Sequence, residues 1–249
     1  MESETQKLAT SESLDILATR TIESEGSELS MSELAKRLAE DIINIPGDRT
    51  RLISLVGGAA SGKTTLSIEL VDSLRQQGIA ADSIGTDDYV IGDREYRRTH
   101  LEGKEPKAKY DFGYMNKLID TIVANHGQAG EVAVPTYNQA TGVAIAEGEA
   151  NYQHKIASVE ALIIEGDFPE VAKPDLTIYL HVDDNLRLSN RLNRDLQHRS
   201  ATDAAKIEEN FNQRQALQHV PYTLPAAALA NIVVVGHVVD GQWKYTVYR

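Results

Sequence analysis

The stretch Gly57-Gly58-Ala59-Ala60-Ser61-Gly62-Lys63-Thr64-Thr65 contains the spacing G-x-x-x-x-G-K-[ST] at every fixed position. This spacing is typical of a loop that wraps around the phosphates of a nucleotide. Glycine lets the backbone turn several N–H groups toward one phosphate cluster, and a helix that begins at Lys63 adds its positive end. We therefore expect these residues to bind a nucleoside triphosphate, with Lys63 on its β and γ phosphates and the hydroxyl of Thr64 on Mg²⁺.

The segments on both sides of this loop support that interpretation. Residues 51–56 form a short apolar run typical of a buried strand, and residues 63–77 predict a helix that Gly78 closes. Further strand-like runs alternate with helical patterns, and they cover residues 79–85, 160–165, 176–182 and 231–235. The alternation predicts an α/β fold with three layers (αβα) and a five-stranded, mostly parallel sheet in the middle.

The other elements complete the expected domain. Helical patterns cover residues 114–125, 184–198 and 203–219, and two short paired strands are expected at 131–137 and 151–157. Residues 92–110 are polar and basic, so we expect a long loop there. Asp240-Gly241 predicts the turn of a small C-terminal hairpin, with residues 243–248 as its returning strand.

The N-terminal part divides at about residue 30. Residues 1–29 are rich in Ser, Thr and Glu, which predicts a flexible or weakly helical extension. Ser30 and Glu33 have the spacing of a capping box and precede an apolar stripe at helical spacing. We therefore expect residues 30–249 to form one P-loop domain.

Charge and composition disfavour several classes of protein. The chain has 37 acidic and 25 basic residues, a formal net charge of −12, so general binding to nucleic acid or to anionic membranes is not expected. It contains no cysteine, which excludes disulfides and cysteine-based metal sites. The N-terminus has no signal-peptide pattern and the apolar runs are short, so a cytoplasmic location is expected. The sequence is compatible with a homo-oligomer.

Carboxylates follow two of the predicted strands and favour phosphoryl transfer. Asp87 and Asp88 come after residues 79–85, and Glu165 ends residues 160–165. The carboxyl ends of parallel strands meet at one edge of the sheet, beside the phosphate loop. A carboxylate there can accept a proton from an acceptor hydroxyl or hold Mg²⁺, although Asp87 and Asp88 can also cap the next turn. The choice between these two aspartates stays open.

Signatures of other nucleotide-binding classes are absent from the sequence. The guanine signature N-K-x-D of GTPases is missing, because Asn116-Lys117 is followed by Leu118-Ile119. No LSGGQ-like segment is present either, which disfavours a transporter ATPase. The remaining expectation is a kinase.

Arg187, Arg191 and Arg194 follow i, i+4, i+7 spacing on the predicted helix 184–198 and share one face. Guanidinium groups on such a face can close over a triphosphate and stabilise charge during transfer. The alternative is a solvated basic face with nearby aspartates as partners.

Together these blocks resemble the uridine kinase and phosphoribulokinase family of P-loop kinases, over about residues 51–235. The resembling blocks are Thr86-Asp87-Asp88-Tyr89, Tyr110-Asp111, Val134-Pro135-Thr136-Tyr137, Leu162-Ile163-Ile164-Glu165-Gly166, residues 175–195, and Val220-Pro221 with residues 225–234.

The resemblance implies an enzyme that uses ATP and Mg²⁺ to phosphorylate a small-molecule acceptor. It implies that Asp87 is the general base and that Lys63 and the arginines of a lid helix, Arg187, Arg191 and Arg194, stabilise the γ-phosphoryl group. Thr64, Asp87 and Glu165 would surround Mg²⁺. Asp111, Tyr137 and Glu165 would lie on the acceptor side.

The acceptor has two candidate classes at this point. The family resemblance favours a nucleoside such as uridine or cytidine. Nucleoside kinases of this family carry a His and an Arg after the proline block, and here Tyr137 is followed by Asn138-Gln139-Ala140-Thr141-Gly142. The basic segment 94–109 favours a sugar, glycerate or pantothenate-like acceptor. A nucleotide-binding regulator without fast turnover is a third hypothesis, suggested by the polar extension 1–29.

Overall fold

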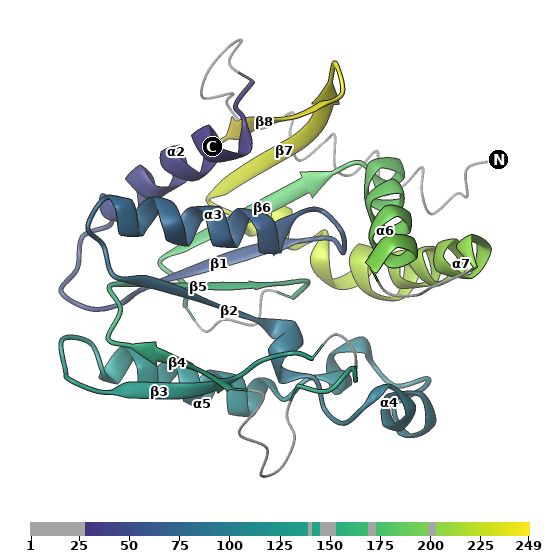
Figure 1. Ribbon diagram of the computed structural model, residues 1–249, viewed down its shortest axis with the longest axis horizontal. Coiled ribbons are helices and arrows are strands. Elements are labelled where there is room, and N and C mark those ends of the chain that lie inside the picture. The colour runs from purple at the N-terminus through teal and green to yellow at the C-terminus, as the bar shows by residue number, and fades with distance from the viewer. Residues whose placement is uncertain (1–27, 139–140, 145–152, 169–172, 199–202) are drawn as a thin grey trace.

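A computed structural model describes residues 28–138, 141–144, 153–168, 173–198 and 203–249. Figure 1 shows a twisted central sheet with helices packed on both sides. The sheet has six strands in the order β2-β5-β1-β6-β7-β8. Their bounds are β1 Arg51–Gly57, β2 Ala81–Gly85, β5 Ala161–Gly166, β6 Leu176–Val182, β7 Ile232–Val239 and β8 Gln242–Tyr248.

The first five strands in that order run parallel, and only β8 is antiparallel to its neighbour. The predicted α/β class, the five parallel strands and the C-terminal hairpin are therefore confirmed. The hairpin does not stand apart, because β8 extends the sheet through β7 as a sixth strand. The expected short ribbon also forms, from β3 (Glu131–Pro135) and β4 (Gln153–Ala157).

The side chains of successive β1 residues point to opposite faces of the sheet, and both faces are buried. Ile53 and Leu55 pack with helices α2 (Met31–Ile43) and α3 (Lys63–Gln76). Leu52 packs on the opposite face with α5 (Phe112–Ala124). The sheet therefore lies between two helical layers, the predicted αβα arrangement.

The N-terminal helix α2 begins where the sequence predicts. Ser30 Oγ accepts a hydrogen bond from the backbone N–H of Glu33, and the Glu33 carboxylate accepts one from the backbone N–H of Ser30. Leu29 joins Tyr245 of β8 through two backbone hydrogen bonds. The expected extension over residues 1–29 lies outside the described residues except for its last two positions.

Two segments have a secondary structure different from the predicted one. Residues 92–110 are not a continuous loop, because Asp93 caps helix α4 (Arg94–His100) and Pro106 begins a 3₁₀ turn, η2 (Pro106–Lys109). The sequence 203–219 is not one regular helix. Helix α7 (Ala204–Arg214) passes into a π-helical segment, η4 (Gln215–Thr223), that contains Pro221. Proline lacks the N–H that a regular helix needs, so the π form accommodates it.

The lid region consists of helix α6 (Asp184–His198), α7 and η4, and helix α8 (Ala226–Leu229) leads from it into β7. In Figure 1, α6 and α7 stand beside the carboxyl end of β1, across from α4. No described helix is long and apolar enough to cross a membrane.

Candidate active site

The phosphate loop, residues 57–64, connects the carboxyl end of β1 to the first residue of α3. Gly62 has φ +96° and Ala60 has φ +64°, so the loop turns through left-handed backbone positions. A Cβ at Gly57 would lie 2.5 Å from the carbonyl oxygen of Leu180 on β6. The loop therefore has the strand-to-helix context that the sequence predicts, and Thr65 continues it inside the first turn of α3.

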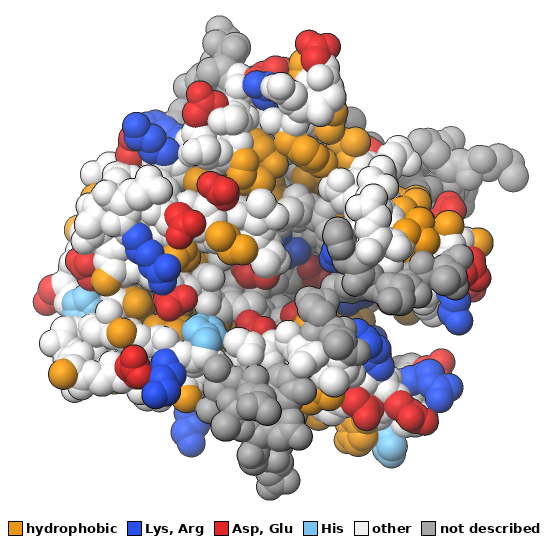
Figure 2. Space-filling model, viewed as in Figure 1, with side chains coloured by type: hydrophobic (Ala, Val, Ile, Leu, Met, Phe, Trp, Pro, Cys, Tyr) orange, Lys and Arg blue, Asp and Glu red, His pale blue; other side chains and the backbone are white. Residues whose placement is uncertain are grey.

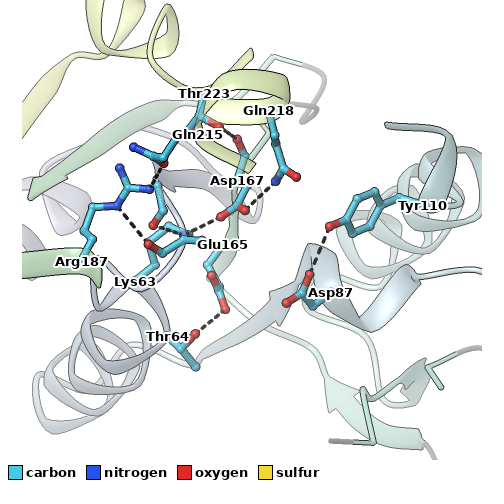
Figure 3. A network of polar contacts seen from close by, with 12 residues as sticks. Lys63, Thr64, Asp87, Tyr110, Glu165, Asp167, Arg187, Gln215, Gln218 and Thr223 are labelled. Atoms are coloured by element: carbon cyan, nitrogen blue, oxygen red, sulfur yellow. Dashed lines mark hydrogen bonds and ion pairs between the residues drawn. The ribbon is translucent and has the colours of Figure 1, made fainter. Parts of the chain in front are cut away.

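Lys63 is held in the site by one acid and one carbonyl. Its Nζ donates to Asp167 Oδ1 at 2.8 Å and to the carbonyl oxygen of Gly58 at 3.0 Å (Figure 3). Only 7% of Lys63 is exposed. Although burial opposes it, the charges of Lys63 and Arg214 lower the pKa of Asp167, so this acid is ionised at neutral pH.

Asp167 is itself fixed by the π-helical segment. Gln218 Nε2 donates to Asp167 Oδ2 at 2.7 Å, and Thr223 Oγ1 donates to the Asp167 carbonyl oxygen at 2.7 Å. Figure 3 shows these contacts gathered around Lys63. Sequence reasoning did not find Asp167, although its place two residues after Glu165 at the end of β5 was an available signal.

Thr64 and Glu165 face each other at the edge of the sheet. Thr64 Oγ1 donates to Glu165 Oε1 at 2.8 Å. Burial raises the pKa of Glu165 to about 7, against the opposing effects of Lys63 and the Thr64 hydrogen bond. The two predicted metal ligands are therefore in contact, and the carboxyl group can gain or lose a proton near neutral pH.

The two aspartates after β2 have different surroundings. Asp88 accepts hydrogen bonds from the backbone N–H of Gly85 at 2.9 Å and of Tyr137 at 2.7 Å, and burial raises its pKa. Asp87 instead receives a 3.4 Å contact from the hydroxyl of Tyr110. Asp88 therefore joins the turn η1 (Thr86–Tyr89) to the strand end at Tyr137, whereas Asp87 points toward the site.

Arg187 lies against the phosphate loop and is buried, with 1% exposed. Its guanidinium donates to the carbonyl oxygen of Ala59 at 3.0 Å, to Asp184 at 2.9 Å and to Gln215 at 2.6 Å. A Cβ at Gly58 would collide with this guanidinium. Arg187 on α6 therefore supports the phosphate loop from one side. The helical spacing instead suggested a residue of a mobile lid.

Arg191 and Arg194 share one acid. Arg191 Nε lies 3.4 Å from Asp195, and Arg194 Nε lies 2.9 Å from it. Nη1 of Arg191 is buried and has no hydrogen-bond partner among the described residues, and burial with the charge of Arg214 lowers the Arg191 pKa to about 10. Arg194 is 42% exposed. The three arginines of the predicted stripe therefore occupy three different environments.

The acceptor-side residues lie beyond Asp87. Asp111 caps α5 by accepting from the backbone N–H of Tyr114 at 2.8 Å. Tyr137 packs against a small apolar cluster with Tyr110 and Phe168. The substrate-binding roles of Asp111 and Tyr137 stay predictions, and the contact made by Asp111 is that of a helix cap.

Arg214 is a site residue that the sequence did not single out. It ends α7 and its side chain is exposed. Although desolvation opposes it, Tyr110, Asp167 and Asp87 raise the pKa of Arg214, so its charge is within electrostatic range of both aspartates of the site. The spacing of arginines within residues 184–198 could not predict that Arg214, at the end of the following helix α7, also lies at the site. Figure 2 shows a hollow near the middle of this face, with acidic and basic side chains close together in it.

A parallel sheet that presents a G-x-x-x-x-G-K-T loop at its carboxyl edge, beside a helical lid, defines the P-loop class of nucleotide-binding proteins. The model of the Phosphoribulokinase / Uridine kinase family matches residues 52–239. The chain belongs to this family of P-loop kinases.

Similar proteins include relatives and solved structures that are distant in sequence. The uridine kinase of Staphylococcus carnosus is 29% identical over 193 residues, covering 74% of this chain and 86% of that protein. Among solved structures, a candidate fructose transport system kinase from Silicibacter sp. TM1040 has a TM-score of 0.60 at 21% identity, covering 79% of this chain and 94% of that one. D-glycerate 3-kinase from Cryptococcus neoformans has a TM-score of 0.54 at 9% identity, covering 94% and 96%. The two structures support the fold alone.

Proposed function

We propose that this protein transfers the γ-phosphoryl group of ATP to a hydroxyl of a small metabolite. The observation that carries the proposal is the placement of Lys63, Thr64, Glu165 and Asp87 at one edge of the sheet, around the phosphate loop. Phosphoryl transfer needs positive charge at the γ-phosphate, a metal position and a base for the acceptor hydroxyl. The site contains a residue for each of these needs.

Asp87 is the proposed base. It accepts the proton of the acceptor hydroxyl while that oxygen bonds to the γ-phosphorus, and the bond from phosphorus to the β–γ bridging oxygen breaks to leave ADP. Asp88 is less suited to this step, because both of its carboxylate oxygens already accept backbone hydrogen bonds. Lys63 and Arg191 supply charge that stabilises the transferring group.

Thr64, Glu165 and Asp87 are the proposed Mg²⁺ ligands, directly or through water. The donor set fits this ion, since Mg²⁺ prefers oxygen ligands and is usually held by one or two carboxylates together with substrate phosphates. Among the described residues no group of three or more acidic or histidine side chains could hold a metal by itself. When bound, Mg²⁺ would neutralise charge on the β and γ phosphates.

Two acceptor classes are supported by different observations. A nucleoside such as uridine or cytidine is supported by the relatives, which are uridine kinases. A sugar, glycerate or pantothenate-like acceptor is supported by the segment after Tyr137, which lacks the His and Arg that nucleoside kinases of the family carry.

The test is a coupled ADP-release assay with Mg²⁺-ATP and a panel of acceptors. The panel contains uridine, cytidine, pantothenate, glycerate, fructose and ribulose 5-phosphate, and Asp87→Asn is assayed beside the wild type. We expect one acceptor to raise ADP release well above background, and Asp87→Asn to abolish the rise. If no acceptor does so while ATP still binds, the kinase proposal loses its support and a nucleotide-dependent regulator becomes the better hypothesis.

A further inference from the structure

Three basic side chains lie on the acceptor side of the site, and two of them, Arg97 and Lys109, form no ion pair with a described carboxylate. They are Arg97 on α4, Lys109 at the end of η2 and Arg214 at the end of α7. These residues come from three separate elements of a chain whose net charge is −12. Tertiary structure, and not a local basic run, therefore brings them together.

Lys109 directly precedes Tyr110, whose hydroxyl contacts the proposed base Asp87, and the backbone of Lys109 is held by a hydrogen bond. Its carbonyl oxygen accepts from the backbone N–H of Ile91 at 2.9 Å, and the next residue, Tyr110, places its hydroxyl 3.4 Å from Asp87. Figure 3 shows Tyr110 on the far side of Asp87 from Lys63. In transfer from phosphate to hydroxyl the base lies beside the acceptor, so groups beyond Asp87 face the acceptor and not the triphosphate.

The ammonium group of Lys109 lacks a counter-charge. Its side chain makes no hydrogen bond or ion pair with the described part of the chain. Partial burial, together with the charges of Arg214 and Arg97, lowers its pKa. Arg97 donates to the carbonyl oxygens of Gly92 and Gly142, and to no described carboxylate. Like charges that are partly desolvated raise the free energy of the folded state until an anion neutralises them.

Arg214 connects this cluster to the reaction centre. The Arg214 side chain is exposed, and its guanidinium makes no hydrogen bond or ion pair with any described residue. The segment that carries Lys109 packs against the segment that follows Arg214, because Lys107 Nζ of η2 lies 5.3 Å from the centre of the Tyr222 ring of η4. Lys109, Asp87 and Asp167 all lie within electrostatic range of Arg214. A ligand anion bound by Arg214 and Lys109 would therefore lie on the same side of the site as the base.

We infer that the phosphate acceptor carries an anionic group, a phosphate or a carboxylate, which Lys109 and Arg214 bind while Asp87 faces the acceptor hydroxyl. This inference rests on the proposed kinase function and narrows its substrate class. It favours the anionic members of the second acceptor class, such as glycerate or pantothenate, over a neutral sugar and over an uncharged nucleoside.

The first test compares acceptors in matched pairs that differ only in the anion. The pairs are glycerate and glycerol, fructose 6-phosphate and fructose, ribulose 5-phosphate and ribulose, and pantothenate and pantothenol, with uridine as an uncharged nucleoside. We expect turnover with at least one anionic member and at least 100-fold lower kcat/KM with its neutral partner. The pair that responds distinguishes a phosphate from a carboxylate.

The second test removes the proposed anion ligands. Lys109→Met and Arg214→Met are each expected to raise the KM for the anionic acceptor roughly 10- to 100-fold, because a charged hydrogen bond is lost, and to leave the KM for ATP within about threefold. Lys104→Met is the matched control, since Lys104 is exposed in the same segment and lies outside the cluster. We expect it to behave as wild type.

A binding experiment covers the case in which no panel member is the acceptor. With the phosphate loop filled by a non-hydrolysable ATP analogue and Mg²⁺, inorganic phosphate and acetate are titrated calorimetrically into wild type, Lys109→Met and Lys104→Met. One anion should bind to wild type and to Lys104→Met, and bind at least tenfold more weakly to Lys109→Met.

The outcomes separate the inference from the kinase proposal. Turnover of uridine or another neutral acceptor at an ordinary KM would overturn the anionic subsite and leave the kinase function intact. Anion binding without turnover of any acceptor would support the subsite and count against the kinase function. If neither anion binds to the nucleotide-filled protein and no anionic acceptor is used, the inference is wrong.

Discussion

Lys63 Nζ lies 2.8 Å from Asp167 Oδ1, and the two side chains form an ion pair that is largely shielded from water. The phosphate-loop lysine therefore has a counter-ion within the protein. Gln218 and Thr223 of η4 hold Asp167 in place, so the position of Lys63 depends on a segment more than 150 residues away along the chain.

Asp167→Asn should lower the free energy of unfolding of the ligand-free protein by roughly 1.5–3 kcal/mol, because Lys63 loses its charged partner in a buried site. ATP should restore part of the loss, since its phosphates supply the missing negative charge. Urea denaturation with and without Mg²⁺-ATP measures both effects. Asp120→Asn, at an exposed position of α5, is the control. Equal stability of Asp167→Asn and wild type would show that the Lys63–Asp167 ion pair contributes nothing to the free energy of unfolding.

Asp87→Asn should mainly lower the catalytic rate, whereas Asp88→Asn should mainly lower stability. Asp87→Asn is expected to lower kcat roughly 10²- to 10⁴-fold with modest change in ATP affinity, because the base acts mainly in the transition state. Asp88→Asn should lower stability by about 1–3 kcal/mol, since an amide can accept only one of the two backbone hydrogen bonds with its oxygen. Steady-state kinetics and thermal denaturation of both variants distinguish the roles. Wild-type turnover in Asp87→Asn would assign the base elsewhere, with Asp88 and Glu165 as the next candidates.

Glu165 should make the stability of the ligand-free protein depend on pH. Burial raises its folded-state pKa from 4.5 to about 7. Between these values the unfolded chain has lost the proton and the folded chain keeps it, so stability falls as pH rises from about 4.5 to 7 and then levels off. The contribution is at most roughly 3 kcal/mol. Unfolding of wild type and Glu165→Gln across this range tests it, and a slope unchanged by the substitution would contradict it.

The same carboxyl group should release a proton when Mg²⁺ and nucleotide bind. A metal ion favours the ionised form, so binding at pH 6.5 should expel a fraction of a proton from the Glu165 carboxyl group of wild type. The Glu165→Gln variant lacks this carboxyl group and should release that much less. Calorimetry in buffers of different ionisation enthalpy measures this release. Equal proton release by both proteins would exclude Glu165 as its source.

Gly58→Ala should disturb the brace that Arg187 forms under the phosphate loop. The added Cβ would collide with the guanidinium, so the variant should lose stability and bind ATP at least tenfold more weakly. In an Arg187→Ala background the same substitution should cost much less, because the obstructing group is gone. Gly113→Ala is the matched control, since neither glycine has a left-handed backbone and the Cβ added at Gly113 would meet nothing closer than 3.5 Å. Additive effects in the double variant would show that the two residues do not interact.

The sequence determined the class of fold and the phosphate loop. The short apolar run at residues 51–56, bounded by the glycine-rich loop, favours a buried strand, and a G-x-x-x-x-G-K-T loop before a helix is typical of phosphate binding. The same local rules predicted the capping box at Ser30 and Glu33 and the hairpin turn at Asp240-Gly241, because each depends on residues close together in the chain. Local rules also failed where a proline forced a π-helical segment instead of a continuous helix at residues 215–223.

Only the tertiary structure separated residues that look alike in the sequence. Asp87 and Asp88 are adjacent, and Arg187, Arg191 and Arg194 share a helical face, yet their burial and partners differ. Arg214 became a site residue only because α7 folds back over the carboxyl edge of the sheet, and η4 holds Asp167 in place there. The charge and hydrogen-bonding of a side chain depend on neighbours that are distant in sequence, and that dependence is why spacing alone could not assign these roles.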